Sequence, residues 1–547
     1  MVATWELIFT VVPGVILFLF GIENFSKEIL AVAKGRFAAI LGDLTTNRYK
    51  GLLLGAGITA LVQSSAATTV IAINLVNAGT ISFVQSLGII IGSNIGTTIT
   101  SQLVAFKLTS FGPAFIIAGF LIGLIGGRYK FLGKPLFYFG LVFFGLTLVN
   151  NGIDPYKNDP LVLELLGGIA FLPLAIFVGF LVTTAFQSSS VTTGLVVILA
   201  QQGMITMPEA IPFLLGANIG STTTALFASR GLDLYARRAA AAHTIFNIGG
   251  VLLILPFLGP FVDLIALIGG TEAQQVANAH LVFNVVASGI FIIALHPFAR
   301  LVIRLVPGEE EEILFRTVAI RKDMPKSPDE ALPLIEAEVQ HLYEITHQAF
   351  DAAIAVFEAA KPPHAYQKAG KLELVNDYID EEIEKAVFLL SRQAMSETEG
   401  KKTVLLVRIS NELERLGDLS RDLAKVGRNA HRKGTPFPKG QVEAIRGIYR
   451  IFDGNIQELA KNFPHSNKET INSLRARDIE LQRALNLEYS LYLKRIAELN
   501  ESGDSRYLEI LSILEAANGK IRDIRKLTED YSALDEHSIS VFPERTI

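Results

Sequence analysis

The sequence predicts an all-α fold in which a polytopic membrane part precedes a water-soluble helical part. Charge is spread unevenly, because residues 1–307 hold 15 Lys or Arg and 11 Asp or Glu, whereas the remaining residues hold 34 and 42. Long apolar segments fill the first part, and amphipathic helical patterns fill the second. An internal repeat within the first part is the third observation. The two parts therefore match two different solvents, lipid and then water.

Apolar segments long enough to span a bilayer recur through the first part. They lie near residues 5–26, 83–105, 111–127, 133–150, 208–228, 239–258 and 277–305. Two further segments, about 51–79 and 163–203, are interrupted by the polar stretches "QSSAATT" and "QSSSVTT". Membrane backbone leaves helical geometry only where protein or a water-filled cavity covers it. We therefore predict two re-entrant helical hairpins with polar tips; continuous spanning helices with polar residues facing their neighbours are the alternative.

Basic residues favour the hairpins over continuous helices. With re-entrant hairpins, only Lys107 and Lys157 fall on one face of the membrane. The other face then holds Lys34, Arg36, Arg48, Lys50, Arg128, Lys130, Lys134, Arg230, Arg237, Arg238, Arg300 and Arg304. If the first hairpin crossed the membrane fully, the basic residues Arg128, Lys130 and Lys134 would lie outside the cell, against the positive-inside rule. This topology predicts a multi-pass protein of the cytoplasmic (inner) membrane, with its N-terminus outside and its C-terminal domain in the cytoplasm.

The repeat relates residues 55–100 to residues 179–224, an offset of 124, with 16 identities and no gap. It pairs "GSNIGTTIT" with "GANIGSTTT", and its identities gather on polar residues inside apolar segments. Packing alone would preserve apolar identities, so this pattern indicates a duplicated site. Each copy carries an odd number of crossings, which makes the copies inverted. Inverted repeats build alternating-access transporters whose site lies between the halves.

The polar tips carry neutral oxygen ligands and open the second arm of each hairpin. Side-chain amides, hydroxyls and free carbonyls suit an alkali cation such as Na⁺, whereas a helix N-terminus suits an anion. Neither polar stretch contains Lys or Arg, so a bound dianion would need co-bound cations to offset its desolvation. Hydroxyls that merely bond a carbonyl one turn back are the alternative, and clustering and duplication favour a site. The stretches 94–100 and 218–224 are expected to face the hairpins from neighbouring broken helices.

These features resemble the bacterial branch of the type II sodium–phosphate cotransporter family. The resemblance rests on the paired QSS hairpins, the two NIG stretches and "RRAAAAHTIFN", and covers about residues 5–305. It implies sodium-driven uptake of inorganic phosphate across the bilayer. It implies phosphate-binding residues Ser64, Ser65, Ser188, Ser189, Asn94 and Asn218, and sodium-binding residues Gln63, Thr97, Thr100, Gln187, Ser188, Ser221 and Thr224. The chain departs from the family pattern at Ala66 and Ala217, which leaves the number of sodium sites open.

The second part reads as six amphipathic helices in two bundles of three. Its stretch "NELERLGDLSRDLAK" (411–425) resembles the PhoU domain, which implies a cytoplasmic regulatory role. The resemblance also implies a divalent-metal patch at Glu414, Asp418 and Asp422; a salt-bridged surface with nearby basic residues is the alternative. The predicted domains are 1–307 (repeats 5–127 and 133–258, final helix 277–305), linker 308–331, helical domain 332–534 and tail 535–547.

Other function classes are weaker alternatives. A membrane receptor that senses phosphate without transporting it would share the binding site, and a transporter of another tetrahedral oxyanion would share the mechanism. An enzyme is not expected, because no Gly-x-Ser-x-Gly elbow or neighbouring base accompanies the hairpin serines. No basic patch indicates nucleic acid, and the absence of cysteine excludes disulfides. The oligomeric state is open, a homodimer included.

Overall fold

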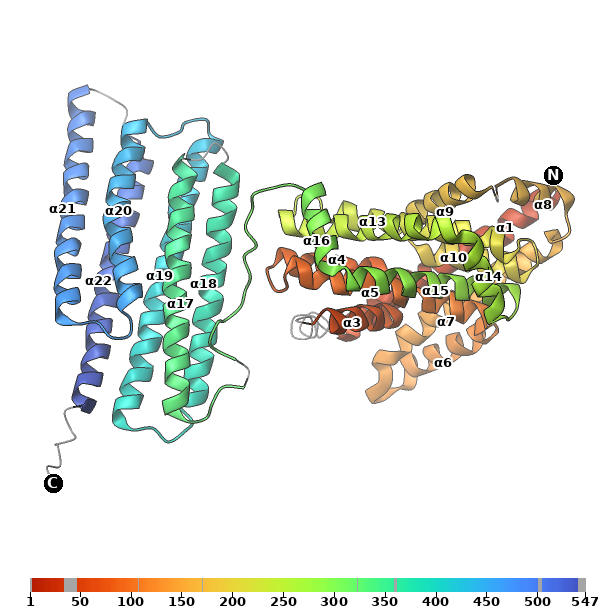
Figure 1. The fold of residues 1–547 in the computed structure, drawn as a ribbon, viewed down its shortest axis with the longest axis horizontal. Coiled ribbons are helices and arrows are strands. Elements are labelled where there is room, and N and C mark those ends of the chain that lie inside the picture. The colour runs from red at the N-terminus through yellow and green to blue at the C-terminus, as the bar shows by residue number, and fades with distance from the viewer. Residues whose placement is uncertain are drawn as a thin grey trace. The chain divides into compact units, whose positions relative to one another are not determined.

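The computed structural model of this chain describes residues 2–33, 47–106, 108–169, 171–321, 323–358, 362–499 and 504–539. Among the predicted basic residues, Lys34, Arg36 and Lys107 lie outside these ranges, as does the predicted tail from residue 540. Every regular element within the described ranges is helical, which confirms the predicted all-α fold (Figure 1). The chain divides into two compact units, Met1–Glu312 and Ile313–Ile547.

The first unit is the membrane part. Its helices are α1 (Val2–Ala33), α3 (Arg48–Val62), α4 (Ser65–Asn77), α5 (Phe83–Ala105), α6 (Gly112–Ile125), α7 (Gly133–Ile153), α8 (Pro160–Ile169), α9 (Leu172–Phe186), α10 (Ser189–Gln201), α11 (Met207–Gly220), α12 (Thr223–Ala228), α13 (Leu234–Ile254), α14 (Leu258–Ile268), α15 (Glu272–Ile293) and α16 (Leu295–Leu305). Among the described residues, six helical segments are long and apolar enough to cross a membrane, or seven if the bent pair α8 and α9 is one span. The chain is therefore a multi-pass membrane protein by length and composition.

Two helical hairpins interrupt these spans. The arms α3 and α4 have 15 and 13 residues, so each rises only about 20 Å and falls short of the bilayer core. The turn between them needs one left-handed residue, Gln63 (φ 58°), followed by the extended Ser64. The arms α9 and α10 repeat this turn at Gln187 (φ 52°) and Ser188. The predicted hairpins are confirmed, and the polar stretches form their tips.

Close backbone contacts preserve the repeat in three dimensions. A Cβ at Gly55 would lie 2.2 Å from the carbonyl oxygen of Ile89, and one at Gly179 would lie 2.2 Å from that of Phe213. Both members of this contact keep the offset of 124 residues. The hydroxyls of Thr59 and Thr68 bond across the first hairpin at 2.9 Å, and their counterparts across the second hairpin are 2.7 Å apart. The duplicated sequence therefore builds two equivalent hairpin–helix units.

The unit departs from the predicted spans in three places. Helix α6 has only 14 residues, because Gly127 (φ +45°) ends the segment in a left-handed turn. A single final helix over 277–305 is predicted, but the chain forms α15 and α16, since Pro297 has no N–H for the carbonyl four residues back. The predicted break after Asn218 occurs between α11 and α12, whereas α5 runs unbroken through Asn94.

The segment that follows α16 is fastened to the membrane unit. Glu312 accepts a hydrogen bond from the Phe83 N–H at the start of α5, and Glu310 accepts one of 2.8 Å from the Leu234 N–H at the start of α13. The Arg238 side chain donates to the carbonyl oxygen of Val306 at 3.1 Å. Carboxylates at helix N-termini satisfy free N–H groups and the helix dipole.

The second unit consists of two three-helix bundles that share one hydrophobic core. The first bundle contains α17 (Pro328–Glu358), α18 (Pro362–Leu390) and α19 (Glu397–Arg432), and the second contains α20 (Lys439–Asn462), α21 (Lys468–Leu499) and α22 (Ser505–Ile539). The bundles join where α17 packs on α20 and α19 packs on α22. In Figure 1 these helices run alongside one another. The predicted pair of bundles is confirmed.

Candidate functional site

Both hairpin tips line one cavity of about 440 Å³ in the membrane unit. The first tip contributes Gln63, Ser64 and Ser65, and the second contributes 187–190. Ser221, at the break between α11 and α12, and one face of α1 complete the lining. The structure therefore brings together seven of the predicted site residues: Gln63, Ser64, Ser65, Gln187, Ser188, Ser189 and Ser221.

The tip of the first hairpin is closed by its own hydrogen bonds. Gln63 is 8% exposed, and its Oε1 accepts a hydrogen bond of 2.6 Å from the Thr100 hydroxyl. The same hydroxyl lies 3.5 Å from the Ser190 hydroxyl of the second hairpin. Ser64 caps α4 by accepting from the N–H of Ala67 at 3.2 Å. Groups of α4 and α5 therefore satisfy the Gln63 amide oxygen and the Ser64 hydroxyl.

The tip of the second hairpin is open. Gln187 is exposed, and Ser188 makes no side-chain cap on α10. The hydroxyl of Thr224, the counterpart of Thr100, is buried and has no hydrogen-bond partner among the described residues. Sequence explains part of this difference, because the counterpart of Ser190 in the first hairpin is Ala66, which has no hydroxyl to offer Thr224. Thr224 is not among the residues that line the cavity, but an orphaned buried hydroxyl is costly, so its side chain suits an additional ligand.

The start of α10 can receive an anion. The first N–H groups of a helix have no intrahelical partner, and the helix dipole favours negative charge there. In α4, the Ser64 side chain occupies one of these N–H groups, whereas the equivalent serine of α10 leaves it free. Neutral oxygens and helix N–H groups therefore meet at the second tip.

The asparagines of the two NIG stretches are not among the residues that line the cavity. Asn94 donates to the Ile90 carbonyl oxygen one turn back, as does Thr97 to that of Ser93. Asn218 instead joins a buried network, because its Oδ1 lies 3.3 Å from His280 Nε2 and its amide donates to Asn284 at 3.3 Å. Their assignment to phosphate stays a prediction, and so does that of Thr97 to sodium.

Two charged residues of the cavity were missed as site residues. Glu23 and Lys27 of α1 lie in its lining, and their side chains pair at 2.6 Å. Lys27 stands out in the sequence only as the first basic residue after an apolar run, a signal of topology rather than of binding. No other ionisable side chain lines the described cavity, so its protein charge sums to zero.

The predicted metal patch of the second unit has different neighbours from those expected. Burial, then Asp418, Asp377 and Asp380, raise the pKa of Glu414 to about 7. Burial and nearby carboxylates likewise raise the pKa of Asp377 to about 6. Asp377 and Asp380 of α18 therefore act on Glu414 together with Asp418. Metal binding by Glu414, Asp418 and Asp422 stays a prediction.

We expect Glu414→Gln to stabilise the protein at pH 8 but not at pH 5. A raised folded-state pKa means that the folded state binds the proton more tightly than the unfolded state, so stability falls as pH rises from about 4.5 to 7. Solvent screening of this half-buried side chain limits the gain to about 1 kcal/mol. Thermal unfolding of the purified chain at both pH values measures it. The exposed Asp422→Asn is the control, and an equal Glu414→Gln effect at both pH values would contradict the prediction.

Comparison with known families covers both units. Residues 17–151 and 169–294 match the family described as Na⁺/Pi-cotransporter. Residues 339–426 match the PhoU domain, which covers most of the first bundle. No solved structure matches the chain significantly.

Similar individual proteins are found in bacteria and mammals. The uncharacterized protein YqeW of Bacillus subtilis is 31% identical over 268 residues, which are 48% of this chain and 86% of YqeW. The putative inorganic phosphate export protein YjbB of Escherichia coli K12 is 26% identical over 269 residues, which are 48% of this chain and 49% of YjbB. The human sodium-dependent phosphate transport protein 2C is 45% identical over 98 residues, which are 17% of this chain and 16% of that protein. The similarity to all three is confined to about half of this chain or less.

Proposed function

Because this chain belongs to the Na⁺/Pi-cotransporter family, we propose that it couples the movement of inorganic phosphate across the cytoplasmic membrane to that of sodium ions. The observation that carries the proposal is the single cavity lined by both hairpin tips. Inverted repeats that share a central site support alternating access, in which one half rocks against the other around bound substrate. The membrane orientation proposed with it places the N-terminus outside and the PhoU-like unit in the cytoplasm.

Charge balance in the cavity gives a physical reason for coupling. Among the residues that the structure describes, Lys27 is the only basic one in the lining, and Glu23 already neutralises it. A phosphate dianion that leaves water for this cavity therefore needs positive charge from elsewhere, because isolated charges are costly to desolvate. Sodium ions bound beside it supply that charge. Without sodium, phosphate binding loses its electrostatic compensation.

The roles of the tip residues follow from their contacts. We assign sodium to the second tip, where Gln187, Ser188 and Ser221 line the cavity with neutral oxygens. Thr224 is assigned with them as the repeat counterpart of Thr100, and its buried hydroxyl lacks a partner among the described residues. We assign phosphate to the space between the tips, against Ser64, Ser65, Ser188 and Ser189 and the start of α10. At the first tip, the Thr100 hydroxyl donates to the Gln63 side chain. This pair of residues therefore holds α3 to α5 and can bind sodium only if its hydrogen bond opens.

If sodium and phosphate move together in the same direction, an inward sodium gradient drives phosphate import. Export is the second candidate, because YjbB, which is similar over 48% of this chain, is named a putative inorganic phosphate export protein. The two directions use the same cavity and differ in the prevailing gradients. A receptor that binds phosphate without moving it is the remaining alternative.

Reconstituted vesicles test the proposal. With the purified chain in liposomes, we expect an imposed inward sodium gradient to accumulate radiolabelled phosphate at least tenfold above a matched choline gradient. Reversing the gradient in preloaded vesicles measures export by the same protein. Adding unlabelled sulfate or arsenate as a competitor of labelled phosphate shows which oxyanion the protein prefers. Phosphate binding without accumulation in either direction would establish a receptor instead, and accumulation indifferent to sodium would refute coupling.

A further inference from the structure

A cluster of one histidine and two carboxylates lies where the two bundles of the second unit meet. His347 and Asp351 occupy one face of α17, four residues apart, and Asp453 lies opposite them on α20. Their ligand atoms all lie within 4.8 Å of one another. His347 Nε2 is 2.6 Å from Asp453 Oδ1 and 3.7 Å from Asp351 Oδ2. The cluster is separate from the carboxylates around Glu414.

Supporting hydrogen bonds hold the outer oxygens of both carboxylates. The Tyr449 hydroxyl donates to Asp351 Oδ1 at 2.6 Å, and Gln457 Nε2 donates to Asp453 Oδ2 at 2.9 Å. Burial and the adjacent carboxylates raise the pKa of the Tyr449 hydroxyl, so it remains a donor. Donors on the outer oxygens leave the inner oxygens turned toward His347, an arrangement typical of the shell that orients metal ligands.

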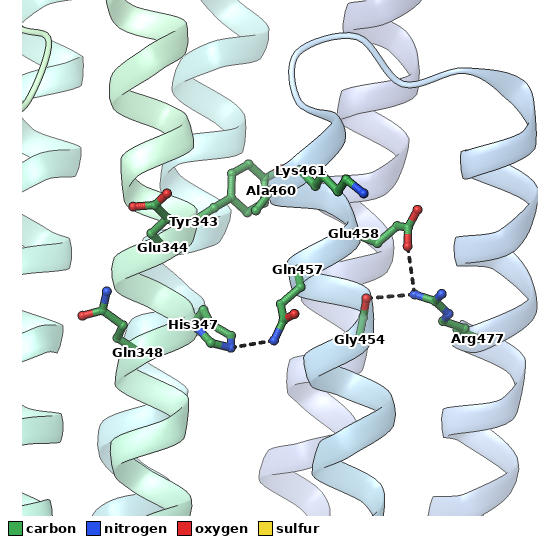
Figure 2. Close-up of a pocket in the computed structure, with 10 residues that line it drawn as sticks. All are labelled: Tyr343, Glu344, His347, Gln348, Gly454, Gln457, Glu458, Ala460, Lys461 and Arg477. Atoms are coloured by element: carbon green, nitrogen blue, oxygen red, sulfur yellow. Dashed lines mark hydrogen bonds and ion pairs between the residues drawn. The ribbon is translucent and has the colours of Figure 1, made fainter.

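The two contacts of His347 Nε2 cannot both be satisfied in one protonation state of the ring. Its Nε2 faces the Gln457 amide nitrogen at 3.1 Å (Figure 2) and Asp453 Oδ1 at 2.6 Å. A protonated Nε2 satisfies the carboxylate but opposes the amide donor, and an unprotonated Nε2 does the reverse. Turning the amide over would break its bond to the outer oxygen of Asp453. A cation on Nε2 attracts the Asp453 carboxylate as a proton does, and because it occupies the Nε2 lone pair the Gln457 N–H must then turn to another acceptor.

Charge and access agree with such an ion. Among the described residues, neither Asp351 nor Asp453 forms an ion pair with lysine or arginine. A groove of about 590 Å³ between α17, α20 and α21 reaches His347 and Gln457, and Arg477 lines its far side (Figure 2). Solvent can therefore deliver an ion and complete its coordination.

We propose that His347, Asp351 and Asp453 bind a divalent transition-metal ion, Zn²⁺ or Mn²⁺, which links α17 to α20 across the bundle interface. Ligands about 2.1 Å from a tetrahedral ion are about 3.4 Å apart, close to the His347–Asp351 separation. The shorter His347–Asp453 separation of 2.6 Å must widen, which a small turn of one side chain allows. Nitrogen and carboxylate ligands suit both ions.

Metal titration of the full chain tests the site. Binding of Zn²⁺ to detergent-purified, chelator-treated protein is measured by calorimetry in the wild type and in an E414Q/D418N background, which disables the other carboxylate cluster. We expect H347Q and D453N each to weaken one Zn²⁺ site by more than the roughly 10–100-fold typical of losing a supporting contact. E344Q is the matched control, since Glu344 lines the same groove outside the cluster.

A thiol probe keeps the test independent of folding. The chain contains no cysteine, so H347C introduces the only thiol. We expect Co²⁺ to give a thiolate-to-cobalt absorption band in H347C that D453N/H347C weakens. Zn²⁺ binding unchanged by both H347Q and D453N, or no cobalt–thiolate band in folded H347C, would overturn the proposal and leave the cluster an ordinary ion-pair network.

Discussion

We expect Gln187→Gly to lower sodium-dependent phosphate uptake about 100-fold while leaving the protein folded. Glycine adopts the left-handed backbone of residue 187 without strain, so the hairpin turn survives and only the amide is lost. Loss of a ligand to a desolvated ion, at about 3 kcal/mol, lowers uptake about 100-fold. Ser188→Ala has a similar effect, because that hydroxyl is free at the open tip.

Two further variants separate the amide from the backbone. Gln187→Asn retains an amide and tolerates the left-handed conformation, so it should recover part of the uptake and show a weaker apparent sodium affinity. Gln201→Ala, at the far end of α10, is the matched control and should transport normally. Sodium dependence of radiolabelled uptake in vesicles distinguishes these outcomes. Normal uptake in both Gln187→Gly and Ser188→Ala would contradict the assignment of sodium to the second tip.

Gly55→Ala should prevent the membrane unit from reaching its native packing. The added methyl would lie 2.2 Å from the Ile89 carbonyl oxygen, and backbone on both sides leaves no flexible side chain to move aside. Helices α3 and α5 must separate, at a cost of about 3 kcal/mol or more. We expect little folded protein in the membrane and a lowered melting temperature in what remains.

Gly57→Ala is the control for helix propensity. Gly57 lies in the same helix, and nothing is within 4 Å of a Cβ built there. Alanine is the better helix former by about 1 kcal/mol, so this variant should be as stable as wild type or more so. Fluorescence-detected size exclusion and thermal unfolding of both proteins measure the difference. Equal stability of the two variants would show that the close contact of α3 with α5 is dispensable.

The sequence was informative about the fold of the membrane unit for a physical reason. Lipid forbids irregular backbone except inside protein, so a polar interruption of an apolar segment predicts a hairpin tip directly. The structure places Gly55 and Gly179 against a carbonyl oxygen, a close contact that the repeat alone did not predict. The ends of helices were harder to predict from the sequence. The break between α15 and α16, for example, depends on the single hydrogen bond that Pro297 cannot donate.

The candidate site was predictable in its residue types but not in its asymmetry. Sequence places Gln63 and Gln187 in equivalent positions, and only the structure shows one bonded to Thr100 and the other exposed. The difference depends on partners from other helices, which sequence spacing does not reveal. The same limit applies to Lys27 and to Asp377, which join their clusters through tertiary packing.

The fastening of residues 306–312 decides where the two units can be separated. The run of glutamates reads in sequence as an acidic linker, yet Glu310 and Glu312 cap the N-termini of α13 and α5. Cutting the chain at Pro307 to isolate the membrane unit would strip both helices of these caps. Ending the chain after Glu312 keeps both caps. The two truncated proteins differ by only five residues, and only the longer one retains the native N-termini of α13 and α5.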